Sequence, residues 1–165
     1  MRVIGIDTSL RSTGLGIVEA RGSVFTLVEH GRIHNPAALP LSACLHRLAT
    51  ALSETLARVR PDVAAIEDIF FAKNARTAMI LGEARGVVIA ACTAAGLPVF
   101  EYPPRRVKQA VSGSGAAEKA QVRRMVMTIL GMVEEPQEDA GDALAIAICH
   151  LNTRSPVPEL AAKPI

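Results

Sequence analysis

Val3-Ile4-Gly5-Ile6-Asp7 is a short apolar run that ends in a carboxylate, and it predicts a buried β-strand near the start of the chain. A lone charged carboxylate is costly to bury, so such a group is usually paired, protonated or bound to a metal. Turn-forming residues follow as far as Gly14, and the apolar run from Leu15 to Val18 predicts a second strand. Asp7 is therefore expected near the tip of a hairpin, either as a functional group or as a cap that accepts hydrogen bonds from the turn.

Two further patterns extend the hairpin. A turn is predicted over residues 19–23, and residues 24–30, continuing toward Ile33, predict a third strand. Three strands with short connections favour an antiparallel meander. Leucines then recur at helical spacing over residues 41–59, and Pro61 ends that helix.

A second carboxylate follows a second buried strand. Residues 63–66 are fully apolar and end at Glu67, and a helix leading into such a strand implies parallel pairing. Ligands of α/β sheets gather at the carboxyl ends of parallel strands. Asp7 and Glu67 therefore converge if their strands are neighbours, whereas the alternative is two separate, exposed acids.

The middle of the chain is predicted to be mostly helical. Residues 75–95 form one helix, in which four small residues repeat every fourth position and share a face: Gly82, Gly86, Ala90 and Ala94. That face would allow close approach of another helix, either in the core or across a dimer. A strand over residues 99–102 and helices over 103–110 and 118–130 complete this region.

The last ordered element is predicted to carry two more acids. From Ala143 the sequence is apolar around the whole helix circumference, which predicts a buried helix. Asp139 and Asp142 are three residues apart and share one face at its N-terminus. One acid there would be a cap, whereas a pair facing one way is more than capping requires. Residues 152–165 contain three prolines and no clear periodicity, so they are expected to be surface or disordered.

Composition bounds the class of protein. A chain of 165 residues with 50% hydrophobic and 3% aromatic residues predicts one domain with an aliphatic core. The three cysteines are far apart, which argues against a disulfide framework or a cysteine zinc site, and the four histidines show no metal-ligand spacing. We expect a cytoplasmic protein without a signal peptide or membrane span, because no apolar run reaches the length of about 18 residues that a span needs.

Charge is distributed unevenly along the chain. Residues 69–130 carry nine basic and three acidic residues, whereas residues 131–165 carry two basic and six acidic ones. A basic region beside an acidic cluster suits a site that cuts a polyanion, although ordinary solvated surface is the alternative. The candidate nucleic-acid contacts are two adjacent aromatics and the nearby cations: Phe70, Phe71, Lys73, Arg76, Arg105, Arg106, Lys108, Lys119 and Arg123.

Taken together, these segments resemble the RuvC family of bacterial Holliday-junction resolvases, in order and with family-like spacing from residue 1 to about residue 150. The segments that carry the resemblance are Gly5-Ile6-Asp7 with Thr13-Gly14, Ile66-Glu67, FFAKNA at 70–75, Glu83 to Gly86, residues 98–102, residues 107–109 and residues 139–147. The family usually has Pro-Gly after the first acid, where this chain has Thr8-Ser9.

The resemblance implies an α/β, RNase H-like fold over residues 1–151: a five-stranded mixed sheet, with an antiparallel meander and parallel strands, flanked by helices. It implies a homodimer that makes paired nicks in a four-way DNA junction during recombination and repair, with RuvA and RuvB as expected partners. The family's catalytic and metal-binding acids correspond to Asp7, Glu67, Asp139 and Asp142. Its DNA-contacting lysines correspond to Lys108 and Lys119, and its junction-probing aromatic to Phe70 or Phe71.

The predicted chemistry agrees with this assignment. Carboxylate oxygens suit Mg²⁺, with Mn²⁺ as the alternative. Two ions about 3.5–4 Å apart can activate a water and stabilise the leaving oxygen of an in-line displacement. Such a mechanism requires no serine, histidine or cysteine nucleophile.

Three alternative functions can be distinguished from this one by features of the sequence. A kinase- or actin-like ATPase shares the Asp-bearing hairpin but needs two such domains, and 165 residues supply one. A YqgF-type relative acting on RNA shares the fold, whereas the FFAKNA segment and the pair Asp139 and Asp142 favour RuvC. A non-catalytic junction-binding protein would not need four acids.

Overall fold

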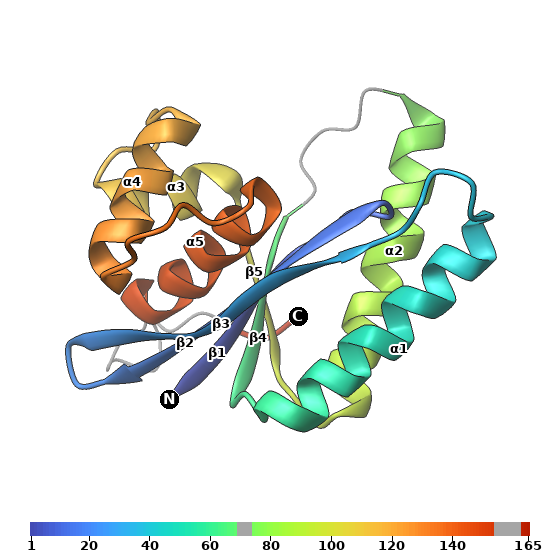
Figure 1. Ribbon diagram of the computed structural model, residues 1–165, viewed down its shortest axis with the longest axis horizontal. Coiled ribbons are helices and arrows are strands. Elements are labelled where there is room, and N and C mark those ends of the chain that lie inside the picture. Colours follow the sequence, from blue (N-terminus) through green and yellow to red (C-terminus); the bar gives the residue numbers. More distant parts are fainter. Residues whose placement is uncertain (69–73, 154–162) are drawn as a thin grey trace.

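The computed structural model describes residues 1–68, 74–153 and 163–165, and it contains a five-stranded sheet with the order β3-β2-β1-β4-β5 (Figure 1). The first three strands form an antiparallel meander: β1 (Arg2–Asp7), β2 (Ser12–Arg21) and β3 (Val24–His34). The last two strands run parallel to β1: β4 (Val63–Glu67) and β5 (Val99–Tyr102). The mixed sheet predicted from the sequence is thus confirmed.

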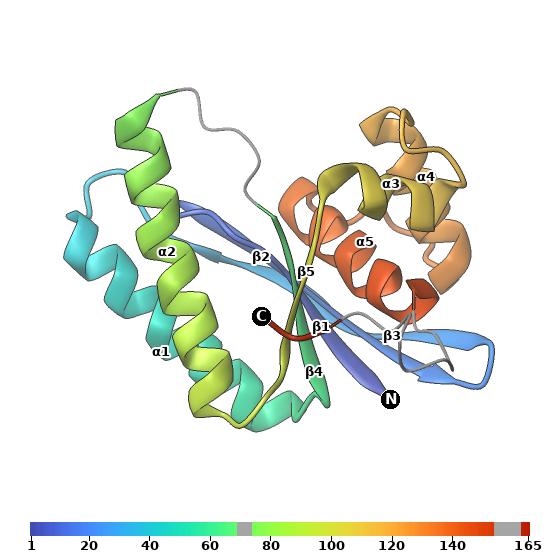
Figure 2. The same cartoon turned by 180° about the vertical axis from the view of Figure 1, so that it is seen from behind.

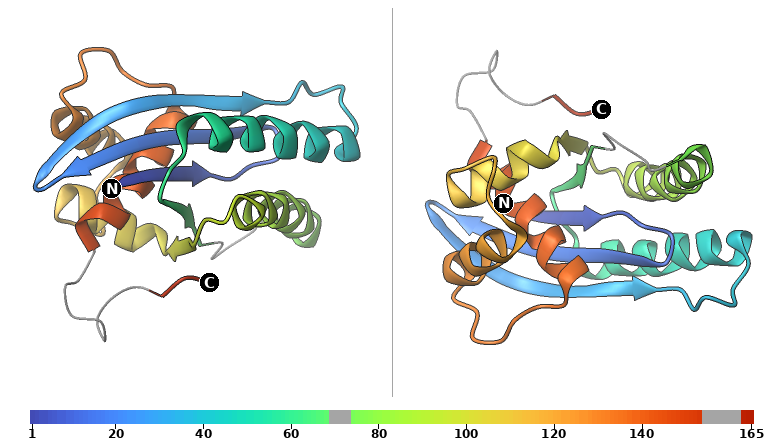
Figure 3. Two further views of the ribbon diagram at one scale, coloured as in Figure 1. Left: turned by 90° about the horizontal axis from the view of Figure 1, so that it is seen from below. Right: turned by 90° about the horizontal axis from the view of Figure 1, so that it is seen from above.

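Helices cover both faces of the sheet, as the front and back views show (Figures 1 and 2). One face carries α1 (Leu41–Val59) and α2 (Ala75–Ala94). The other carries α3 (Pro104–Ser112), α4 (Lys119–Leu130) and α5 (Glu138–Thr153). Views from below and above show the strands side by side in the order of the sheet (Figure 3).

The alternation of side chains along the central strand creates two cores. Ile4 and Ile6 of β1 are fully buried and pack with Leu48 and Leu52 of α1. Val3, on the other face of the same strand, belongs to the cluster formed with α5. A strand that is covered on both faces must be apolar throughout, which accounts for the sequence that opens the chain.

The turn predicted at residues 19–23 is shorter than expected. β2 continues through Glu19 to Arg21, and the reversal is made at Gly22, whose φ of +61° suits glycine. The charges that suggested a turn are paired on the strand surface: Glu19 accepts from Arg2 at 3.3 Å and from Arg21 at 3.0 Å. One cross-strand ion pair and one ion pair within β2 therefore occupy the charged residues for which polarity alone had predicted a turn.

Helix α2 is unusual because it is apolar yet mostly exposed. Only Ala84, Val88 and Cys92 are buried, and Met79 is 67% exposed. By length and composition alone it passes as one candidate membrane span among the described residues, which is weak support for a membrane protein. The same exposure is typical of a surface that contacts another protein chain.

The end of the chain returns to the edge of the sheet. Helix α5 continues to Thr153, two residues into the segment predicted to be a tail. The backbone N–H of Ile165 donates to the carbonyl of Val99 on β5 at 2.9 Å.

Candidate active site

Three elements bring acids to one edge of the sheet. Asp7 ends β1 and Glu67 ends β4, and because these strands are parallel neighbours, their carboxyl ends lie side by side. Helix α5 begins at Glu138 and contributes Asp139 and Asp142 from its first turns. The convergence predicted from the strand pattern therefore holds for the strands, and α5 supplies the remaining acids.

Glycines on the sheet allow α5 to approach closely. A Cβ atom on Gly5 would lie 2.0 Å from the carbonyl oxygen of Ala143, and one on Gly14 would lie 1.9 Å from that of Asp139. Gly16 is equally tight against the backbone of Leu144. No other residue type fits these contacts, because the helix backbone itself occupies the space. Since Gly14 pairs with Asp7 across the hairpin, the same contact sets the start of α5 beside the first acid.

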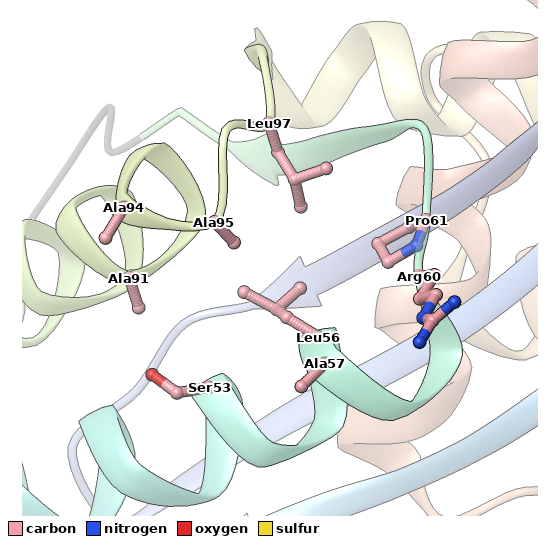
Figure 4. A pocket seen from close by; sticks show the side chains of 9 residues that line it. All are labelled: Ser53, Leu56, Ala57, Arg60, Pro61, Ala91, Ala94, Ala95 and Leu97. Atoms are coloured by element: carbon pink, nitrogen blue, oxygen red, sulfur yellow. The ribbon is translucent and has the colours of Figure 1, made fainter.

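A cavity of about 260 Å³ lies at this edge of the sheet. Asp7, Glu67 and Asp142 line it, together with Lys108 and Lys119. A larger cavity of about 480 Å³ lies between α1 and α2, with a mostly apolar lining: Ser53, Leu56, Ala57, Arg60, Pro61, Ala91, Ala94, Ala95 and Leu97 (Figure 4). The smaller cavity is the candidate active site because it alone of the two collects acids and cations.

The acids lie close enough to change each other's ionisation. Burial, followed by the negative charges of Asp142, Glu67 and Asp139, raises the pKa of Asp7 from 3.8 to about 7. Burial and then Asp142 also raise the pKa of Glu67. Crowded, partly buried carboxylates of this kind are stabilised when a cation is added between them.

The lysines partly offset this charge. The ammonium of Lys119 contacts Glu138 at 3.0 Å and Asp142 at 3.2 Å, and these partners raise its pKa to about 12. Lys119 was predicted to bind DNA, and the structure places it against the acids of α5. Lys108, the other predicted lysine, lies on the wall of the same cavity.

Asp139 is held by a residue that sequence patterns did not identify. The hydroxyl of Ser12, at the start of β2, donates a hydrogen bond to Asp139 Oδ2. The turn before Ser12 is closed by other hydroxyls: the Ser9 N–H donates to Thr13 Oγ1 at 3.3 Å, and the Ser12 N–H donates to Ser9 Oγ at 3.3 Å. The polar turn between β1 and β2 therefore contacts the start of α5 through the bond from Ser12 to Asp139.

The donor set fits a hard divalent cation. Carboxylate oxygens are the ligands that Mg²⁺ and Mn²⁺ prefer, and the repulsion that raises the pKa of Asp7 is the repulsion that a cation would relieve. Within the described ranges, no group of three or more histidine, cysteine, aspartate or glutamate side chains is arranged as a ready-made metal site. The fit therefore rests on the shared cavity and the raised pKa values of its acids.

The remaining predicted contacts are dispersed around this edge. Arg76 is exposed in the first turn of α2, and Arg105 and Arg106 are exposed on α3, which follows β5. Arg123 is ion-paired with Glu135 at 2.7 Å. Phe70, Phe71 and Lys73 lie outside the described residues.

The fold and the acid cluster together define an RNase H-like nuclease. A yeast mitochondrial Holliday junction resolvase, Ydc2, shares this fold, with a TM-score of 0.69 and 14% identity over 91% of this chain and 77% of that one.

Proteins of higher sequence identity show the family to which the chain belongs. The family model for the crossover junction endodeoxyribonuclease RuvC matches residues 3–150. The RuvC of Citrifermentans bemidjiense is 48% identical over 93% of both chains. The structure of T. thermophilus RuvC in complex with a Holliday junction substrate superposes with a TM-score of 0.92 and 36% identity, over 100% of this chain and 99% of that one. The chain belongs to the RuvC family of crossover junction endodeoxyribonucleases.

Proposed function

We propose that this protein resolves four-way DNA junctions by hydrolysing one phosphodiester bond in each of two opposed strands, with Asp7, Glu67, Asp139 and Asp142 as the catalytic acids. The observation that carries the proposal is the cavity in which acids from β1, β4 and α5 meet beside two lysines. Four-way junction DNA is the substrate that a RuvC relative holds in its structure.

The reaction would depend on a divalent cation, Mg²⁺ or Mn²⁺, with two ions per site as the expected number. Oxygens of Asp7, Glu67 and Asp142, which line the cavity, would hold the metal together with Asp139. The Asp139 carboxylate also accepts a hydrogen bond from the Ser12 hydroxyl. Bound there, the metal supplies an activated water and neutralises charge on the phosphate. The chain itself fixes the acids on rigid strand ends, so little reorganisation is needed during the reaction.

Cations around the cavity would supply affinity for the DNA backbone. Lys108 lines the cavity, while Arg105 and Arg106 extend from the same helix to the solvent. Phosphate contacts of this kind act on every DNA and are strongly salt-dependent. These contacts would bind any DNA, so another feature must distinguish a four-way junction from ordinary duplex.

That feature, we propose, is Phe70 or Phe71, on the basis of sequence position alone. Both follow Glu67 closely in the chain, so a ring there would reach bases beside the cut. Stacking one base is worth about 1–3 kcal/mol, which offsets part of the cost of opening the exchange point. Replacing each ring by alanine should reduce nicking of the junction more than binding for the ring that contacts DNA.

A homodimer would supply the two identical sites that paired cuts require. The stripe of small residues on α2 points away from the core: Gly82, Gly86, Ala90 and Ala94 are all exposed, and nothing lies within 4 Å of a Cβ atom on either glycine. Exposed Met79 on the same helix adds apolar surface. A second copy of the chain is the occupant that this helix would receive.

We further propose a cytoplasmic protein that works beside RuvA and RuvB. The three cysteines are free, buried thiols, which suits a reducing compartment. The association with RuvA and RuvB rests on family membership.

The test is a nicking assay on four-way, flap and linear DNA, with and without Mg²⁺. We expect symmetrical nicks in the four-way junction only when the metal is present, and loss of nicking in Asp7→Asn with junction binding retained. Glu54→Gln, on the exposed surface of α1 and away from the acid cluster, is the matched control and should nick normally.

The rival functions give different results in the same assay. Junction binding without nicking at any metal concentration would favour a non-catalytic binding protein. Cleavage of structured RNA in preference to DNA would favour a YqgF-type role.

A further inference from the structure

One arginine joins three elements directly behind the acid cluster. Arg85 lies on α2, and its side chain is only 14% exposed. Its Nη1 atom donates to the backbone carbonyl of Glu67 at 2.8 Å, at the end of β4. Its Nη2 atom pairs with Glu101 Oε2 on β5, also at 2.8 Å. The planar guanidinium therefore spans a helix and two strand ends at once.

Other bonds near Arg85 connect the end of β4 to β5. The backbone N–H of Asp68 donates to the carbonyl of Tyr102 at 2.9 Å, which ties the residue after Glu67 to β5. Glu101, the anchor of Arg85, also shares a hydrogen bond with the Asp68 carboxyl, which raises the pKa of Glu101. Arg85 and Asp68 thus both interact with the Glu101 carboxylate near the point where β4 ends.

We propose that Arg85 is a positioning residue that fixes the backbone of Glu67, and through it the Glu67 carboxylate, relative to Asp7. The proposal rests on the catalytic role proposed above for Glu67. Arg85 donates to the main chain of the acid and does not line the cavity that holds the acids. Its effect is therefore on geometry, and misplacement of a catalytic group by about 1 Å can cost about 100-fold in rate.

The ion pair alone would not require an arginine here. Buried ion pairs contribute little net stability, and apolar residues often replace them without loss. The Glu67 carbonyl and the Glu101 carboxylate, however, contact the two terminal nitrogens of one guanidinium. The single ammonium of a lysine cannot reproduce that two-armed geometry.

The experiment compares Arg85→Gln, Arg85→Lys and the control Glu54→Gln in the full-length protein, with Mg²⁺ and a four-way junction. Three quantities are measured: the single-turnover nicking rate at saturating protein, the junction Kd, and the unfolding temperature. For Arg85→Gln we expect the rate to fall about 10- to 100-fold while the junction Kd stays within about threefold. Arg85→Lys should recover part of the rate, and Glu54→Gln should match the unmodified chain.

Nicking by Arg85→Gln at the normal rate would overturn the proposal, as would a rate loss explained wholly by weaker junction binding. If Arg85→Gln does not fold at the assay temperature, Glu101→Gln replaces it, because this change releases the anchor and keeps the cation. A rate loss of at least about threefold in Glu101→Gln would then support the proposal, and an unchanged rate would overturn it.

Failure of the proposed function gives a different pattern. In that case the unmodified chain does not nick, and Glu67→Gln behaves identically to it. Normal nicking by the unmodified chain, with loss in Glu67→Gln and none in Arg85→Gln, removes only the role of Arg85.

Discussion

The two faces of the sheet are covered in opposite ways. On one face, the backbone of α5 lies directly on Gly5, Gly14 and Gly16, with no side chain between helix and strand. On the other face, α1 packs through large aliphatic side chains, and α2 leaves most of its apolar surface exposed. Backbone contact leaves little room for adjustment, so it suits the placement of acids. An exposed apolar helix suits contact with a second chain.

Glycine substitutions should show the largest difference in stability between the two faces of the sheet. Gly5→Ala places a methyl group against the carbonyl of Ala143, and backbone cannot give way as a side chain can. We expect a loss of at least about 3 kcal/mol in the free energy of unfolding, measured with urea. Gly86→Ala on α2 meets nothing within 4 Å and should instead stabilise the helix by about 0.5–1 kcal/mol. Equal effects of the two changes would contradict the difference between the faces.

Removing the charge of Asp7 should stabilise the metal-free protein. Its raised pKa, about 7 against 3.8, means that the folded state holds a proton that the unfolded state has released, so stability falls as pH rises through this window. Asp7→Asn should therefore gain about 1–4 kcal/mol near pH 8 and gain almost nothing near pH 4.

Thermal unfolding at both pH values tests this prediction. Added Mg²⁺ should raise the unfolding temperature of the unmodified chain far more than that of Asp7→Asn, because binding to the folded state stabilises it. If Asp7→Asn is less stable than the unmodified chain at both pH values, the charged Asp7 carboxylate does not destabilise the folded state.

A charge on the exposed surface of α2 should weaken the proposed dimer and leave the monomer folded. Met79 is 67% exposed, so Met79→Asp costs the isolated chain little. Across a dimer interface an unpaired carboxylate would cost about 1–3 kcal/mol, or about 10- to 100-fold in dimer Kd. Sedimentation should show a monomer with unchanged thermal stability. A variant that still forms the dimer at the same concentration would place the interface elsewhere.

The smallest effect is expected at Ser12. Ser12→Ala removes the hydroxyl that donates to Asp139, and loss of such a bond costs about 1 kcal/mol. We expect the nicking rate to fall about threefold to tenfold, with normal junction binding. Ser9→Ala, in the same turn but bonded only to backbone and hydroxyl groups, should change the rate less. The reverse order would place the important contact within the turn.

The sequence could predict the strand ends, the convergence of Asp7 and Glu67, and the pair of acids at the start of the last helix. Apolar runs that end in Asp7 and Glu67, with a helix leading into the second, imply adjacent parallel strands, and adjacency implies convergence. Periodicity also predicted the stripe on α2. Periodicity could not predict whether that face of α2 packs in the core or is exposed. Residue spacing shows which residues share a face, but it does not show what contacts that face.

The contacts that hold the site could not be predicted in this way. Ser12 and Asp139 are 127 residues apart in sequence, and Arg85 reaches a backbone carbonyl, which leaves no pattern in the chain. A glycine within a strand signals only a weak strand former until the helix above it is known. Lys119 was expected to contact DNA from its charge and from the family resemblance, and that contact stays a prediction. Its ion pair with Asp142 could not be predicted, because the distance depends on how α4 and α5 pack.

The most direct test of the central claim is to locate Mn²⁺ by anomalous X-ray scattering in crystals of the protein. We expect anomalous density in the cavity between Asp7, Glu67 and Asp142, and none there in crystals of Asp7→Asn. Density at another site, or an empty cavity at a manganese concentration that supports junction nicking, would contradict the assignment of these acids as the catalytic centre.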